Sequence, residues 1–82
     1  MTILPVHQEI LDYVKQHHLE KKFLKQKAFF EYNPFYPSLE TELMEPRSLR
    51  IWSFRVDKKY RAMFIFRDAQ TIEILDVNNH YQ

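Results

Sequence analysis

The sequence predicts a small α+β domain in which an N-terminal helical hairpin packs on a twisted antiparallel β-sheet. Two observations support this prediction. Apolar residues recur every three or four positions up to residue 32, as on one face of a helix. From residue 49 onward they alternate with polar residues, as in strands that have one buried face. The chain has 82 residues, so residues 1–82 are expected to form a single domain.

The N-terminal region is expected to supply both helices of the hairpin. The first should span about residues 5–17, because Pro5 suits the first helical turn, where its missing N–H costs nothing. A second helix is expected from about residue 19 to residue 32. It should stop at Asn33-Pro34, since the residue before a proline is pushed out of the α region. The corner is then His17-His18. The expected apolar band of the second helix is Leu19, Phe23, Leu24, Ala28 and Phe30.

Two further segments are expected to be irregular or very short. Residues 33–48 form a long connection, and its three prolines exclude a continuous helix. Long loops in compact domains are often functional. The apolar residues expected to anchor this loop are Phe35, Leu39, Leu43 and Met44. Near the N-terminus, Thr2-Ile3-Leu4 fits either a very short strand or a tail.

The C-terminal third is expected to form a three-stranded meander, with strands within residues 49–56, 60–67 and 71–81. Side chains alternate along a strand. Pairing Val56 with Tyr60 would therefore gather the apolar residues on one face, which the helices can cover.

The same register places Arg55 directly opposite Arg61 on the other face of the sheet. That face should also carry Ser53 and Met63. Like charges directly opposite each other are destabilising, and a guanidinium stays charged. The pair should therefore bind an anion or be neutralised by a carboxylate. The carboxylates expected for a structural ion pair are Asp76 and Glu73.

Charge is segregated along the chain, although the net charge is only +1. Residues 47–67 hold seven lysines and arginines against one acid, whereas residues 31–45 hold four glutamates and no base. A basic region of this kind attracts nucleic acid or an acidic protein. The alternative is a set of solvated strand edges, where lysine and arginine discourage aggregation.

The composition excludes several classes of site. No cysteine is present, which excludes disulfides and thiolate metal sites and makes a reducing cytoplasm the expected location. The chain has no glycine, so P-loop, dinucleotide-binding and Gly-x-Ser-x-Gly motifs are excluded. His7, His17 and His18 show no i, i+4 pairing, so neither a metal ion nor a cofactor is expected. No apolar run reaches the ~18 residues that span a membrane, and no signal peptide is expected.

Four segments occur in a characteristic order and spacing. They are Asn33-Pro34 with Pro37-Ser38-Leu39, Trp52-Ser53-Phe54-Arg55-Val56, Tyr60-Arg61-Ala62-Met63-Phe64 and Asp76-Val77-Asn78-Asn79-His80-Tyr81. With this set the chain resembles the RelE/ParE superfamily of bacterial toxins from type II toxin–antitoxin systems. The resemblance runs from about residue 19 to the end, and no single segment is diagnostic by itself.

The resemblance implies a RelE-like fold, a partner and an activity. The partner is a cognate antitoxin, which should lay an amphipathic helix or strand on the domain and cover basic surface. The RelE-like and YoeB-like branches imply cleavage of mRNA in the ribosomal A site without a metal ion. The ParE branch implies inhibition of DNA gyrase instead. Pro37 stands where the YoeB-like branch has a glutamate, which leaves the general base open.

RNA can be cut by attack of its own 2′-hydroxyl on the adjacent phosphate, which needs a base, a cation and an acid. Arg61 is the first candidate for binding the phosphate and Arg55 the second, because a guanidinium can bind two oxygens at once. His80 is the candidate acid or base, since histidine titrates near neutral pH. The alternative for His80 is a frayed terminal residue. Tyr81 is a candidate for stacking on a base or orienting the phosphate, and its alternative is simple packing.

The remaining candidates are a possible base and a positive field. Glu42 is a candidate base, with Glu40 close by, although loop carboxylates are more often merely solvated. Lys58, Lys59 and Arg50 are expected to bind RNA through their positive field.

Three functions are therefore open. The first is a metal-independent endoribonuclease toxin that acts on mRNA at the ribosome and is neutralised by an antitoxin. The second is a ParE-like inhibitor of DNA gyrase, which needs no general acid or base. The third is a catalytically inactive relative that keeps the fold and binds an antitoxin.

Overall fold

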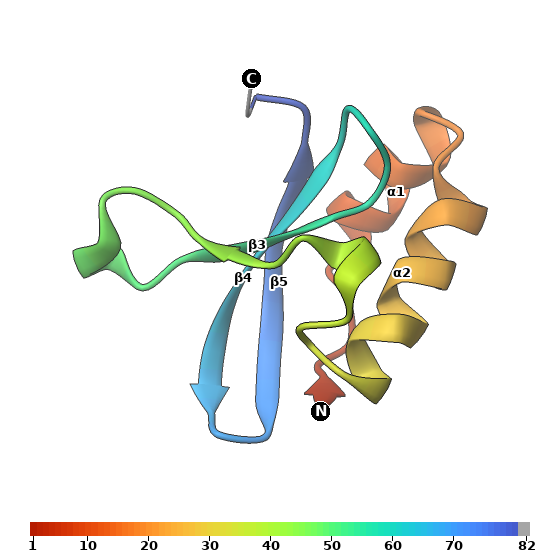
Figure 1. The fold of residues 1–82 in the computed structure, drawn as a ribbon. Helices are drawn as coiled ribbons and strands as arrows, with labels where there is room; N and C mark the ends of the chain where they lie inside the picture. Colours follow the sequence, from red (N-terminus) through yellow and green to blue (C-terminus); the bar gives the residue numbers. More distant parts are fainter. Residues whose placement is uncertain (81–82) are drawn as a thin grey trace.

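A computed structural model describes residues 1–80 and shows two helices on one side of a five-stranded sheet (Figure 1). The helices are α1 (Gln8–Gln16) and α2 (Glu20–Tyr32). The strands are β1 (Thr2–Ile3), β2 (Glu42–Leu43), β3 (Trp52–Arg55), β4 (Arg61–Asp68) and β5 (Thr71–Asn78). Two short 3-10 turns flank β2, at Pro37–Leu39 and Arg47–Leu49. The predicted α+β class is confirmed.

The sheet is mixed, which corrects the expectation of a purely antiparallel sheet. Its strand order is β1-β5-β4-β3-β2, with β1 parallel to β5 and the other neighbours antiparallel. The N-terminal segment is therefore a short strand and not a tail. Leu4 N donates a hydrogen bond to Ile72 O at 2.9 Å as the chain leaves β1. A parallel neighbour needs a long crossover, and here both helices and three strands separate β1 from β5.

The core lies between the helices and one face of the sheet. Phe30 of α2 packs on Phe54 and Phe64, with ring centroids 5.1 and 4.9 Å away, and all three side chains are fully buried. The complete buried set is Ile3, Ile10, Val14, Leu19, Phe23, Phe30, Leu39, Phe54, Val56, Ala62, Phe64, Ile72, Ile74 and Val77.

The apolar band expected for α2 is partly wrong. Leu24 is 62% exposed and Ala28 is also exposed, whereas the polar Gln26 is buried. Gln26 Nε2 donates hydrogen bonds to Ser38 O at 3.1 Å and to Arg55 O at 2.7 Å. A buried polar group left without its partner costs roughly 1–3 kcal/mol. Gln26 is therefore a satisfied buried residue that ties α2 to the long loop and to β3.

The apolar residues expected to anchor the long loop of residues 33–48 are confirmed in part. Leu39 is fully buried and Leu43 and Met44 are half-buried, but Phe35 is 57% exposed. The expectation for Phe35 is wrong because its ring lies at the rim of the core, edge-on to Trp52 with centroids 6.0 Å apart.

The predicted register between the middle strands is confirmed, since Arg55 pairs with Arg61 and Ser53 pairs with Met63. The side chain of Arg61 faces away from the helices, because the neighbouring Ala62 is buried in the core.

Two strand ends differ from the expected segments. β3 begins at Trp52, because residues 47–49 form a 3-10 turn and Arg50 adopts a left-handed φ of 56° that redirects the chain. β5 contains a bulge at Leu75 and ends at Asn78, which pairs with Arg61. The candidate residue Tyr81 lies outside the described residues.

Candidate functional site

Arg61 occupies the centre of the candidate site. Its side chain lies on the outer face of the sheet and is only 13% exposed. Its Nε donates to Ser53 Oγ at 2.9 Å, and its Nη2 donates to the backbone carbonyl of Ser53 at 3.3 Å. Nη2 also donates to the backbone carbonyl of Glu40. Arg61 therefore fastens the long loop to the middle of the sheet.

Two carboxylates of this loop neutralise the arginine pair. Glu40 reaches both arginines, with Oε2 at 3.4 Å from Arg55 Nη1 and Oε1 at 4.0 Å from Arg61 Nη1. Glu42 Oε1 lies 3.9 Å from Arg61 Nη2. Both glutamates are more than half exposed. Exposed ion pairs are worth only roughly 0–1 kcal/mol, so a stronger anion can displace these carboxylates.

The carboxylates expected to neutralise the pair bind other groups, so that expectation is wrong. Asp76 Oδ2 accepts a hydrogen bond from Asn78 Nδ2 at 2.6 Å. Glu73 Oε1 accepts from Arg67 Nε at 2.8 Å, and its Oε2 lies 2.6 Å from His7 Nε2. The hydrogen bond with His7, followed by that with Arg67, lowers the pKa of Glu73. This second cluster ties the start of α1 to the β4–β5 hairpin, outside the arginine site.

The arginine pair and the β3–β4 turn enclose a pocket of about 250 Å³. Its lining residues are Glu40, Arg55, Asp57, Lys58, Lys59 and Arg61. Four of these six side chains are cations, and the Arg55 side chain is 38% exposed. Excess positive charge beside a guanidinium that can bind two oxygens suits a phosphate group. We call this the arginine pocket.

Asp57 gives the basic turn its shape. Its Oδ1 accepts hydrogen bonds from the backbone N–H of Lys59 at 2.8 Å and of Tyr60 at 2.9 Å. Its Oδ2 lies 3.4 Å from Lys22 Nζ on α2. Burial alone would raise the pKa of Asp57, but the hydrogen bonds from the two amides and the ammonium of Lys22 together lower it.

The other sequence-predicted residues lie at the edge of the site or away from it. His80 follows the end of β5, with its backbone N–H donating to Asn78 Oδ1 at 3.1 Å and its side chain exposed. Asn78 is the strand partner of Arg61, so His80 lies at the same end of the sheet as the arginine pocket. Arg50 lines a different pocket, of about 470 Å³, together with Trp52 and Phe66. The roles of these residues stay predictions.

Within residues 1–80, no three histidine, aspartate or glutamate side chains gather in a way that could hold a metal ion. Neither helix in this part of the chain has the length and apolar character needed to cross a membrane.

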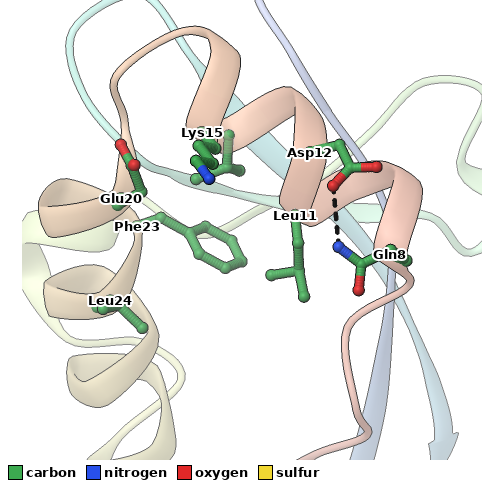
Figure 2. Close-up of a pocket in the computed structure, with 8 residues that line it drawn as sticks. Gln8, Leu11, Asp12, Lys15, Glu20, Phe23 and Leu24 are labelled. Atoms are coloured by element: carbon green, nitrogen blue, oxygen red, sulfur yellow. Dashed lines mark hydrogen bonds between the residues drawn. The ribbon is translucent and has the colours of Figure 1, made fainter.

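A third concave surface lies between α1 and α2 (Figure 2). This groove has a volume of about 290 Å³, and Leu11 and Phe23 point into the space between the helices. Leu11 is 39% exposed and Leu24 is 62% exposed. At the rim, Gln8 Nε2 donates to Asp12 Oδ1 at 2.9 Å. An apolar floor with a polar rim suits an apolar side chain presented by a partner helix.

Two features of the site were not predicted from the sequence. Ser53 is a fully buried ligand of Arg61, although strand alternation had already placed both on one face. Glu40 bridges the two arginines, and the segregation of acidic and basic residues was the signal for this contact.

Solved structures of several toxins share the fold of this chain. No family model matches the sequence, and no curated protein matches it. A YoeB/ParE toxin from Agrobacterium tumefaciens is similar over 99% of this chain and 100% of its own, with 15% identity and a TM-score of 0.70. The YoeB dimer from Staphylococcus aureus is similar over 98% of this chain and 94% of its own, with 20% identity and a TM-score of 0.71.

The heterotetrameric YoeB–YefM toxin–antitoxin complex from Staphylococcus aureus is also similar. The similarity covers 98% of this chain and 94% of the matched chain, with 20% identity and a TM-score of 0.69. The chain therefore has the fold of YoeB/ParE toxins, which confirms the fold implied by its resemblance to the RelE/ParE superfamily.

We predict that Asp57→Asn makes the free energy of unfolding less dependent on pH in the acid range. The folded-state pKa of Asp57 lies below its ordinary value of 3.8. Its charged form therefore stabilises the fold above that value, and this stabilisation is lost as pH falls through the folded-state pKa. Urea unfolding between about pH 2 and pH 6 measures the slope. Asp12→Asn, on the exposed side of α1, is the matched control, and equal slopes for Asp57→Asn and wild type would contradict the prediction.

Proposed function

We propose that this chain is the toxin of a type II toxin–antitoxin pair and that it cleaves mRNA at the ribosome without a metal ion. The observation that carries the proposal is the arginine pocket, where four cations face a carboxylate of the acidic loop. The likeness of fold to YoeB/ParE and YoeB structures supports it. Such a protein acts in the cytoplasm, where its RNA substrate is found.

The reaction that suits this pocket is a transesterification within the RNA strand. A base removes the proton of a 2′-hydroxyl, and the oxygen attacks the adjacent phosphorus to form a 2′,3′-cyclic phosphate. The bond to the 5′-oxygen breaks, and that oxygen takes a proton from an acid. Negative charge grows on the phosphate during the attack, so fixed cations beside it lower the barrier.

We assign the phosphate to Arg55 and Arg61. Arg61 is already held in place by Ser53, so little reorganisation is needed when charge develops. Arg55 is more exposed and approaches the phosphate from the solvent side. The acid is assigned to His80, which lies at the same end of the sheet. Tyr81, the next residue in the sequence, is assigned to stacking on a base.

The base is assigned to Glu42 and not to Glu40. Glu40 bridges the two guanidinium groups, so its carboxylate occupies the position that a phosphate bound by both arginines would take. Binding of the phosphate would move Glu40 out. Glu42 pairs with Arg61 and does not bridge the two arginines, so it can stay beside the bound phosphate.

The second part of the proposal is a protein antitoxin as the partner. YoeB from Staphylococcus aureus is known in a complex with YefM. In the present chain, the groove between α1 and α2 offers exposed Leu24 beside the apolar side chains of Leu11 and Phe23. Its charged lining residues carry both signs, so the apolar contact is what favours a partner helix there.

The burial and the contacts of Arg61 favour a second candidate function. Its guanidinium is mostly covered and is held by Ser53 and Glu40, as expected for a structural residue. A toxin that acts only by binding, such as a ParE-like inhibitor of DNA gyrase, needs no catalytic arginine. The same holds for an inactive relative that binds an antitoxin.

Expression in a bacterial host distinguishes these functions. Wild-type protein should stop translation, measured by pulse labelling, with new mRNA ends. Glu42→Gln and His80→Gln should each slow cleavage about 100-fold or more, since general acid–base groups contribute roughly 10²–10⁴-fold. Glu45→Gln is the matched control, because Glu45 is exposed and pairs with Arg47 outside the pocket. It should arrest growth like wild type.

Other outcomes of this experiment contradict parts of the proposal. Arrested DNA synthesis with intact mRNA would replace the ribonuclease by a gyrase inhibitor. Arrest of neither process would favour an inactive relative. If Glu40→Gln abolished cleavage while Glu42→Gln did not, the assignment of the base would be wrong.

The antitoxin site is tested separately by Leu24→Glu. A carboxylate in the groove should weaken binding of the protein encoded beside this gene about tenfold or more, because it removes an apolar contact and adds charge. Leu75→Glu makes the same change at an exposed leucine outside the groove and should bind like wild type. Calorimetric titration of the purified proteins gives both affinities. Equal affinity for Leu24→Glu and wild type would place the antitoxin elsewhere.

A further inference from the structure

A cluster of three aromatic rings lies next to the basic turn. Tyr13 and His17 come from the end of α1, and Tyr60 immediately precedes β4. The ring centroids of Tyr13 and His17 are 4.1 Å apart, and that of Tyr60 is 5.6 Å from His17. Tyr60 Oη also lies 3.3 Å from His17 Nδ1. The three rings therefore form one continuous aromatic surface.

This surface is open to solvent on one side and supported on the other. His17 is exposed, while Tyr13 and Tyr60 are half-buried and pack against the core. Burial, followed by the neighbouring Tyr60 and Asp76, raises the pKa of Tyr13. The phenol therefore stays neutral at physiological pH and does not repel a nearby phosphate.

The chain connects this surface directly to the arginine pocket. Tyr60 stands between Lys59 and Arg61, and adjacent side chains of a strand point to opposite faces. Arg61 lies on the outer face and Tyr60 lies on the helix side, and Lys58 and Lys59 of the turn that directly precedes them in the chain line the arginine pocket. Figure 1 shows this turn and the α1–α2 corner at the same end of the molecule. Hydrogen bonds between Asp57 and the backbone of Tyr60 hold the ring's position.

We propose that Tyr13, His17 and Tyr60 form a stacking subsite for a nucleobase of single-stranded RNA whose phosphate lies in the arginine pocket. The inference rests on the proposed function, because it assumes that the pocket binds an RNA phosphate. Every base has a flat face that stacks on an aromatic ring, whatever the sequence. A strand that crosses the basic turn brings one phosphate to the arginines and a neighbouring base to the rings.

Two probes separate base stacking from phosphate binding. One is a fluorescein-labelled single-stranded 2′-deoxy octanucleotide, which lacks the attacking hydroxyl and is not cut. The other is the same labelled backbone without bases. Anisotropy titrations at several salt concentrations give both affinities and the salt dependence. Wild type should bind the base-bearing strand about fivefold or more tightly, as expected for stacking of one base.

Variants show whether the aromatic rings cause this preference, which is the ratio of the affinities for the base-bearing and the base-free strand. Tyr60→Leu should bring this ratio close to one and keep the salt dependence. Tyr60→Phe retains the ring and should keep both the ratio and the salt dependence. Arg55→Gln should lower the salt dependence and leave the ratio unchanged. If Tyr60→Leu does not fold, His17→Leu gives the same comparison from the exposed end of the cluster.

The outcomes distinguish failure of the inference from failure of the proposed function. A folded Tyr60→Leu protein with the wild-type ratio would overturn the stacking subsite and leave the arginine pocket intact. Loss of the ratio in Tyr60→Phe as well would assign the effect to the hydroxyl, and this too would overturn stacking. If neither probe showed salt-dependent binding to wild type, the phosphate pocket and the proposed function would both be wrong.

Discussion

The contacts of the Arg61 guanidinium are the interaction on which the candidate site depends. They join β4 to the buried Ser53 of β3 and to the backbone of Glu40 in the long loop. Glu40 is held with a left-handed φ of 45°, and such a conformation costs a non-glycine residue roughly 1–2 kcal/mol. The buried Leu39 beside it and the hydrogen bond from Arg61 offset that cost. Without them, the acidic loop would not lie on the basic strands.

This arrangement explains how two like charges can face each other across a strand pair. Arg55 and Arg61 would repel each other in isolation. The carboxylate of Glu40 lies within reach of both guanidinium groups, so the empty pocket is neutralised by its own loop. The carboxylate is exposed and weakly held, so an incoming phosphate can replace it. In the proposed function, the structural ion pair and the phosphate site are two states of the same residues.

Local rules explain which parts of the structure could be predicted from the sequence. The fixed alternation of a strand placed Arg55 opposite Arg61. Helical spacing placed the corner at His17-His18, and Asn33-Pro34 marked the end of the second helix. The contact between Glu40 and Arg61 joins residues 21 positions apart, and no local periodicity reports such a contact. Gln26 was missed for a related reason. Its burial depends on two carbonyl groups from elsewhere in the chain. β1 is only two residues long, which is too short to show alternation.

The most direct test of the proposed ribonuclease activity is the chemistry of the RNA ends that form in the presence of this protein. Purified protein is incubated with mRNA on ribosomes, and the new ends are identified by mass spectrometry. Attack by the 2′-hydroxyl predicts a 2′,3′-cyclic phosphate, or the 3′-phosphate formed from it, and a 5′-hydroxyl on the downstream fragment. Ends carrying a 3′-hydroxyl and a 5′-phosphate would show attack by water instead. That result, or uncut RNA, would contradict an arginine pocket built for transesterification.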